Sequence, residues 1–163
     1  MVQRKIDNPP FLNMRFRTTI SFLALFFVTH VVGQTRALTG KIIDDSFQPF
    51  MQVKIFNADT VQIGKSDMTG NFNITIPLNI KTLIIASIGM EWKRIDLTDT
   101  CNNIEIILLP SWTYDFRTLK KVDRLRKKEF DKLPRLHKSA FEKGIFISDK
   151  PCYVDNFIPI RRK

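Results

Sequence analysis

Residues 71–76, NFNITI, carry the pattern that decides the fold. The apolar Phe72, Ile74 and Ile76 alternate with polar residues, and successive side chains of a β-strand point to opposite faces. The stretch therefore predicts a strand with one buried face and one wet face. Residues 51–55 repeat the alternation, with three predicted core-facing members, Met51, Val53 and Ile55.

Runs of this kind recur from residue 38 to residue 109 at intervals of roughly 8 to 12 residues, which is typical of an all-β sandwich. We predict seven strands, at 38–44, 51–56, 61–66, 71–76, 82–88, 91–97 and 104–109. The fifth is almost continuously apolar, which predicts a central strand covered on both faces. The C-terminal tail is the expected cover of its second face.

Two turns between these strands carry residues with a structural role. Asp67 is predicted to accept backbone N–H groups two or three residues further on, and Gly70 to adopt the left-handed conformation. Gly89 is predicted at the first central position of a type II′ turn, where φ is positive. A calcium site that combines Asp67 with Asp44, Asp45 or Asp59 is disfavoured, because calcium loops place several acids at alternating positions.

Charge divides the chain. The full chain carries a formal charge of +10, but residues 34–110 hold seven basic and eight acidic side chains, whereas residues 111–163 hold fifteen and seven. The sequence thus predicts a nearly neutral domain followed by a basic C-terminal extension.

Residues 115–133 are predicted to form the main helix of this extension. Its apolar residues, Phe116, Leu119, Val122, Leu125, Phe130 and Leu133, fall within about half the circumference at 100° per residue. The opposite half carries a cationic set, which consists of Lys120, Lys121, Arg124, Lys127, Lys128 and Lys132. Asp115 is expected in the first turn, and Pro134 is expected to end the helix. A second short helix is expected at 135–143, and residues 145–163 are expected to lie against the domain without regular structure.

The segment 14–33, MRFRTTISFLALFFVTHVVG, predicts a secretory signal within residues 1–33, because two arginines precede a short apolar run that ends in a small residue. The run from Ile20 to Val32 is shorter than the roughly 20 residues of a membrane-spanning helix. Translation starting at Met14 is an alternative to Met1. We therefore expect an exported protein that resides in the periplasm, at the outer membrane or outside the cell.

Cys101 and Cys152 are the only cysteines. In an oxidising compartment they can form a disulfide that joins the tail to the end of the domain. The alternative is two unpaired thiols.

A specific set of residues accompanies the strand pattern: Gly40 to Asp44, Pro49, Ser66 to Phe72 and Ser87 to Met90. Together they resemble the carboxypeptidase regulatory-like domain, a transthyretin-like or Ig-like β-sandwich that occurs in envelope proteins of Bacteroidetes-type bacteria. The resemblance covers about half the chain and implies a seven-stranded sandwich at 34–110, with residues 111–163 as a helical, basic extension. It implies a binding module.

Residue patterns for catalysis are missing from this sequence. His137 is the only histidine after the predicted signal, whereas zinc peptidase sites need several His and Glu ligands. Neither Ser87 nor Ser139 has a recognisable base and orienting acid. We therefore expect no catalytic residues, no metal and no cofactor, and a protein that is not an enzyme.

The sequence leads to two functional hypotheses. The first is a non-enzymatic β-sandwich module for binding or scaffolding at the bacterial cell envelope, with a protein or glycan partner and no nucleic acid. Its contact residues are expected at two hairpin tips. One tip carries Asp45, Phe47 and Phe50, and the other carries Glu91, Trp92 and Arg94. For Trp92, a place in the core is favoured over a place at the tip. The alternative is electrostatic attachment, in which the cationic set binds anionic lipid, lipopolysaccharide or another polyanion. The oligomeric state is left open.

Overall fold

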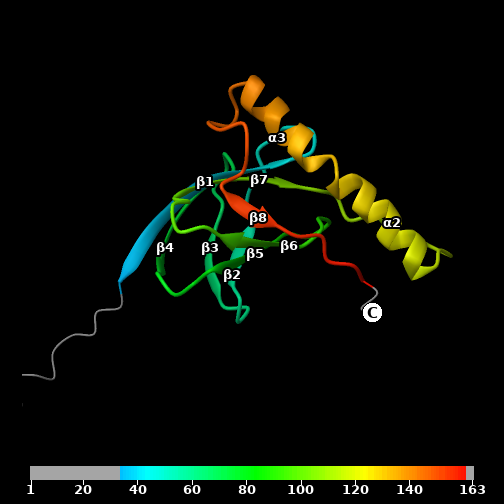
Figure 1. The fold of residues 1–163 in the computed structure, drawn as a ribbon, viewed down its shortest axis with the longest axis horizontal. Coiled ribbons are helices and arrows are strands. Elements are labelled where there is room, and N and C mark those ends of the chain that lie inside the picture. The colour runs from blue at the N-terminus through cyan, green and yellow to red at the C-terminus, as the bar shows by residue number, and fades with distance from the viewer. Residues whose placement is uncertain (1–33, 161–163) are drawn as a thin grey trace, which may run out of the picture. The chain divides into compact units, whose positions relative to one another are not determined.

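A computed structural model describes residues 34–160. The predicted signal in residues 1–33, with both candidate start methionines, lies outside the described residues. The described part is mostly β, with eight strands and two helices (Figure 1). The strands are β1 (Thr35–Asp44), β2 (Lys54–Asn57), β3 (Gln62–Lys65), β4 (Asn71–Pro77), β5 (Thr82–Ala86), β6 (Lys93–Leu97), β7 (Asn103–Leu108) and β8 (Tyr153–Asp155).

The strands form two sheets that make a sandwich. One sheet has the order β4-β1-β7, and the other has the order β3-β2-β5-β6-β8. β1 pairs antiparallel with β4 and parallel with β7, whereas every pair in the second sheet is antiparallel. Alternating residues of both sheets fill the core between them, among them Leu38, Ile55, Ile74, Ile85 and Ile106.

The alternation at residues 71–76 is confirmed, because Phe72, Ile74 and Ile76 of β4 are buried. Met51 was predicted to face the core and does not. It lies in a turn before β2 and is 52% exposed, because the strand begins only at Lys54. The predicted fifth strand is also too long, since β5 ends at Ala86 and Ile88 is fully exposed.

The strands covered on both faces are β1 and β7, not β5 as predicted. Ile43 and Ile107 point away from the sandwich core and form a second apolar cluster with residues of the extension, which are Leu133, Ala140 and Phe146. Ile84 on the outer side of β5 is only partly buried. The extension therefore covers the three-stranded sheet (Figure 1), where both strands offer outward isoleucines.

The extension contains α2 (Leu119–Phe130) and α3 (Leu133–Glu142). The predicted helix at 115–133 starts too early, because Phe116 has a left-handed backbone with φ of 59° and cannot belong to a helix. Asp115 is consequently not in the first turn, which has no acidic residue. Pro134 lies in the first turn of α3, a position that tolerates proline because its missing N–H has no helical partner.

The apolar stripe predicted for the first helix is buried only in part. Val122 and Leu133 are buried, but Leu119 is 53% exposed and Phe116 fully exposed. The last part of the tail also differs from the prediction, because β8 is a regular strand that pairs with β6. Pairing fixes this short segment because β6 would otherwise leave a row of unpaired backbone groups.

The two predicted turns differ in outcome. In the first, Gly70 has the predicted positive φ, 76°, and Asp67 Oδ1 accepts the backbone N–H of Thr69 at 2.8 Å. Its second donor is the N–H of Asn71 at 2.9 Å, which is four residues further on and not three. In the second, Gly89 has φ of 78°, but the turn runs from Ser87 to Met90 and places Gly89 at the second central position. The type II′ assignment is therefore wrong, because a positive φ at that position is characteristic of type II.

Candidate functional site

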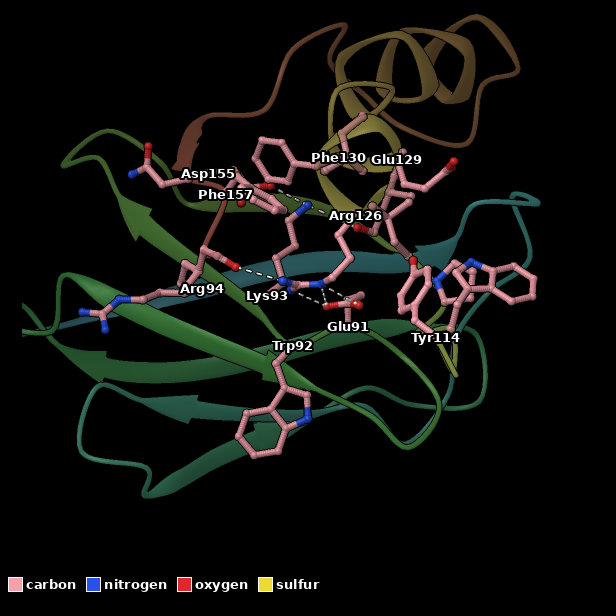
Figure 2. A pocket seen from close by; sticks show the side chains of 17 residues that line it. Glu91, Trp92, Lys93, Arg94, Tyr114, Arg126, Glu129, Phe130, Asp155 and Phe157 are labelled. Carbon is pink, nitrogen blue, oxygen red and sulfur yellow. Dashed lines mark hydrogen bonds and ion pairs between the residues drawn. The ribbon is translucent and has the colours of Figure 1, made fainter. Parts of the chain in front are cut away.

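A groove lies between the start of β6, the end of β7, helix α2 and the chain after β8 (Figure 2). It has a volume of about 70 Å³. Its walls include several aromatic rings, those of Trp92, Trp112, Tyr114, Phe130 and Phe157. The groove exists only because the extension folds back on the edge of the five-stranded sheet.

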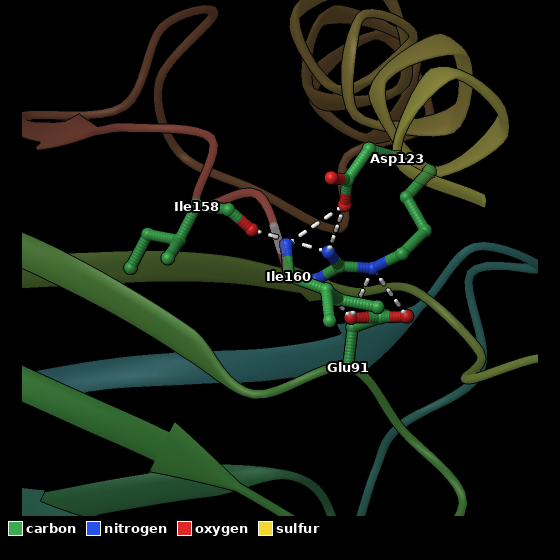
Figure 3. A network of polar contacts seen from close by, with 5 residues as sticks. Glu91, Asp123, Ile158 and Ile160 are labelled. Carbon is green, nitrogen blue, oxygen red and sulfur yellow. Dashed lines mark hydrogen bonds and ion pairs between the residues drawn. The ribbon is translucent and has the colours of Figure 1, made fainter. Parts of the chain in front are cut away.

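Arg126 of α2 lies in one wall of this groove (Figure 2), and Figure 3 shows the polar network that includes its partners Glu91 and Asp123. Its Nε lies 3.0 Å from both carboxylate oxygens of Glu91, and its Nη2 lies 2.6 Å from Glu91 Oε2. Its Nη1 donates to the backbone oxygen of Ile158 at 3.1 Å and contacts Asp123. The hydrogen bonds with Glu91 raise the pKa of Arg126. One guanidinium therefore joins the loop before β6, the helix and the C-terminal segment.

Asp123 completes this network from the helix side. Its carboxylate accepts the backbone N–H of Ile160 at 2.8 Å. Phe157 lies between the same elements, with its ring 5.7 Å from that of Phe130 in an edge-on arrangement and 5.4 Å from the guanidinium carbon of Arg126. The charged groups of this wall are thus already paired with one another.

The aromatic groups at the rim are largely exposed. Trp92 is 70% exposed and Trp112 is 61% exposed. In Figure 2 the Trp92 ring points away from the ion pair of Arg126 and Glu91, while the Tyr114 side chain lies beside that ion pair. Burial raises the pKa of Tyr114, with the Glu91 charge contributing in the same direction. The expectation that Trp92 is a core residue is wrong, because it lies just before β6 and 70% of its surface is exposed.

A buried ion pair forms the floor of the groove. Lys93 Nζ lies 2.7 Å from Asp155 Oδ2, and the two side chains are only 9% and 15% exposed. The Lys93 ammonium also donates to the backbone oxygen of Ile107 at 3.2 Å. Burial lowers the pKa of Lys93, and the Asp155 carboxylate opposes this shift. The pair ties β6 to β8 at the point where the tail joins the sheet.

A second cavity of about 190 Å³ adjoins the same ion pair on the side of α3. Its lining includes Tyr153 and His137. His137 is 3% exposed, and its Nε2 has no hydrogen-bond partner. Glu105 Oε2 lies 3.9 Å from that nitrogen. Burial lowers the pKa of His137, although the Glu105 charge acts in the opposite direction.

Glu105 is the buried acid beside this cavity. It is 4% exposed and accepts the backbone N–H of Ile147 together with the N–H and hydroxyl of Ser148. Its backbone oxygen accepts the Tyr153 hydroxyl at 3.1 Å. Burial raises the pKa of Tyr153. The carboxylate thus receives three donors from the segment after α3, an arrangement that holds the chain in place.

The predicted contact residues are divided between different regions. Glu91, Trp92 and Arg94 line the groove. At the other predicted tip, Phe47 and Phe50 pack against the two apolar clusters and only Asp45 remains exposed. That first tip is therefore a packed turn.

Five members of the predicted cationic set, Lys120, Lys121, Arg124, Lys127 and Lys128, are exposed. Lys127 pairs with Asp131, and Lys132 pairs with Glu129. The set is thus present on α2, although two of its members have acidic neighbours.

Sequence reasoning missed Lys93, Glu105, Arg126 and Asp155. Lys93 shares its strand parity with the buried Ile95 and Leu97, which was a usable signal for an inward-facing lysine. Glu105 lies between Ile104 and Ile106 in the sequence of β7, and its side chain is on the opposite face of the strand, the face that α3 covers. Apart from Asp123, which is three residues before Arg126, the side-chain partners of these four residues lie 35 to 62 positions away in the chain. No local pattern connects residues so far apart.

Cys101 and Cys152 form a disulfide with a Cα–Cα distance of 5.4 Å. It joins the end of the β6–β7 loop to the residue before β8. A disulfide points to an oxidising, extracytoplasmic location.

Residues 34–160 contain neither a candidate metal centre nor a candidate membrane-spanning helix. In this range no three His, Cys, Asp or Glu side chains are grouped so that they could hold a metal ion. None of the described helices combines the length and apolarity needed to cross a membrane.

Comparison with known proteins assigns no family. No protein-family model matches the chain, and no curated protein matches it. Among solved structures, 3-chlorocatechol 1,2-dioxygenase from Rhodococcus opacus 1CP matches with 13% identity and a TM-score of 0.33, over 48% of this chain and 60% of that chain. The C-terminal domain of the PapC usher also matches with 13% identity and a TM-score of 0.33, over 46% of this chain and all of that domain.

These matches are distant and assign neither a family nor an activity. The chain spans about 60% of the dioxygenase. The β-sandwich itself is established by the two sheets. Membership of the carboxypeptidase regulatory-like family stays a prediction.

Proposed function

We propose that this protein is an exported, non-enzymatic β-sandwich module that binds a protein or glycan partner in the bacterial cell envelope through the groove beside α2. The Cys101–Cys152 disulfide supports export, because such bonds persist in oxidising compartments. The periplasm, the outer membrane and the cell exterior all fit this proposal.

The observation that carries the binding proposal is the exposure of Trp92 and Trp112 at the rim of a preformed groove. Tryptophan and tyrosine are enriched among the residues that dominate binding energy at interfaces. Leaving two tryptophans in water forgoes the stabilisation that burying them would give. A partner that covers them would recover it.

The rigidity of the groove wall supports the same function. Arg126 is held by Glu91 and by the backbone of Ile158, so the wall keeps its shape without a ligand. A preformed site loses less conformational entropy on binding than a flexible one. Arg94 lines the groove and is exposed, and can supply a polar contact at its edge.

The groove can be tested by photo-crosslinking in living cells. A photoreactive amino acid with a diazirine group replaces Arg94 in one variant, which keeps both tryptophans, and Met68 in a control, since Met68 is 73% exposed but lies in the β3–β4 turn. We expect light-dependent adducts from position 94 and few from position 68. Mass spectrometry of the adduct distinguishes a protein partner from a glycan.

A second variant makes the result specific to the groove. With the photoreactive group at position 94, Trp112→Ala should lower the adduct yield at least about fivefold, because a tryptophan that dominates an interface contributes about 2 kcal/mol or more. Equal adduct yields from positions 94 and 68, or yields unaffected by Trp112→Ala, would show that the groove is not the binding site.

A further inference from the structure

The segment before α2 exposes two large apolar side chains that the groove does not use. Phe116 is fully exposed and Leu119 is 53% exposed. Phe116 also has φ of 59°, a conformation that bulky residues rarely adopt. Within the described chain, neither packing nor favourable backbone geometry accounts for a phenylalanine at this position.

The outer face of α2 begins directly after these residues. At 100° per residue, Lys120, Lys121, Arg124, Lys127 and Lys128 fall within about 120° of the circumference, opposite the buried Val122. None of Lys120, Lys121, Arg124 and Lys128 forms an ion pair with a residue in 34–160, whereas Lys127 pairs with Asp131. The result is a cationic face with an apolar tip at its N-terminal end.

We propose that this tip and this face bind the surface of an anionic phospholipid bilayer. Phe116 and Leu119 would enter the boundary between headgroups and acyl chains, and the lysines would contact the headgroups. Surface-bound elements combine these two features, since apolar side chains supply insertion and basic side chains supply attraction to anionic lipid. The proposal is independent of the groove, because neither Phe116 nor Leu119 lines it.

Charge complementarity and the apolar tip together favour a bilayer over a soluble polyanion. A polyanion would use the lysines but has no apolar layer to receive Phe116 and Leu119. A bilayer offers partners for both, because its acyl layer can receive the apolar tip at the N-terminal end of α2 and its headgroups can contact the exposed basic side chains.

The test measures cosedimentation of the exported protein with vesicles. One vesicle contains phosphatidylcholine alone, and the other contains phosphatidylcholine with about 30% phosphatidylglycerol, at low and high salt. We expect binding to the anionic vesicle that weakens with salt, because exposed charges are screened.

Two variants separate the contributions of charge and insertion. The triple change Lys120→Gln, Lys121→Gln and Arg124→Gln should weaken binding more than about tenfold. The double change Phe116→Asn and Leu119→Gln should weaken it about fivefold or more and leave its salt dependence in place. Asparagine tolerates the left-handed backbone at position 116, so this change preserves the local geometry.

A control removes three charges elsewhere: Lys54→Gln, Lys65→Gln and Lys150→Gln, all at exposed positions. It should change binding less than about twofold. The proposal is overturned if anionic vesicles are not bound, or if the two triple variants behave alike. It is also overturned if the Phe116 and Leu119 changes have no effect, and equal binding of soluble polyphosphate would then indicate a polyanion site. Thermal unfolding of each variant shows whether it is folded.

Discussion

At the scale of single residues, Glu105 shows how a buried charge is made tolerable. Its carboxylate is removed from water, but it accepts three hydrogen bonds from Ile147 and Ser148. Burying an unpaired carboxylate would cost several kcal/mol, whereas a fully hydrogen-bonded one is far less costly. The neighbouring His137 has no such compensation at Nε2.

This environment of His137 predicts a pH dependence of stability. Burial lowers the pKa of His137 in the folded state, whereas the unfolded chain has the ordinary pKa of 6.5. At pH values near and below 6.5 the unfolded chain therefore binds more protons at this residue than the folded chain does. The free energy of unfolding should therefore decrease on acidification from pH 7.5 to pH 5.5, by at most about 1.4 kcal/mol per pH unit. Urea unfolding at the two pH values measures it.

His137→Gln is the matched variant. It should remove this part of the pH dependence, whatever its effect on stability at pH 7.5. If the variant loses as much stability as the wild type between the two pH values, His137 is not the responsible group.

At the scale of elements, the turns are decided by backbone geometry more than by side-chain chemistry. Gly70 and Gly89 both have positive φ. A Cβ built on Gly70 would lie 2.4 Å from the backbone oxygen of Ile42, whereas one on Gly89 would have no atom within 4 Å. The two positions therefore separate the cost of the conformation from the cost of a steric clash.

We expect Gly89→Ala to lower the free energy of unfolding by about 1 kcal/mol, the cost of a left-handed alanine. Gly70→Ala should lower it by about 3 kcal/mol, because the clash with β1 adds to the same conformational cost. Denaturant unfolding of both variants provides the comparison. Equal losses would mean that the chain around Gly70 relaxes without cost.

The helices show what can and what cannot be predicted from the spacing of apolar residues alone. The sequence pattern located a basic helix and a short second helix, and both are present. It did not show that the first begins only at Leu119, because the positive φ of Phe116 leaves no mark in the spacing of apolar residues. The same pattern predicted that the tail covers β5, because local hydrophobicity does not show which outward-facing isoleucines a helix distant in sequence will contact.

At the scale of the described domain, the tail is held at separate points along its length. The Arg126–Glu91 pair, the Cys101–Cys152 disulfide and the Lys93–Asp155 pair follow one another in that order along it. Each joins the extension to a different part of the sandwich. The groove depends on all three attachments, because residues 155–158 of the tail form part of its lining.

Replacing both cysteines tests the covalent attachment. The double variant Cys101→Ser and Cys152→Ser should lower the free energy of unfolding by about 4 kcal/mol, the loop entropy for a separation of 51 residues. Denaturant unfolding with and without reductant measures it, and the reductant should affect only the wild type. A wild type that is insensitive to reductant, with free thiols by mass spectrometry, would contradict the bond and weaken the case for export.

The strands of the sandwich could be predicted from the amino-acid sequence, because alternation with period two in residues such as 72–76 specifies a strand with one buried face wherever it lies. The nearly neutral segment and the basic extension after it could be predicted as well, since charge is additive along the chain. The groove, the Lys93–Asp155 pair and the Glu105 contacts arise only when the chain folds. These join residues that are distant in sequence, and their positions are set by how the tail packs, which local patterns do not encode.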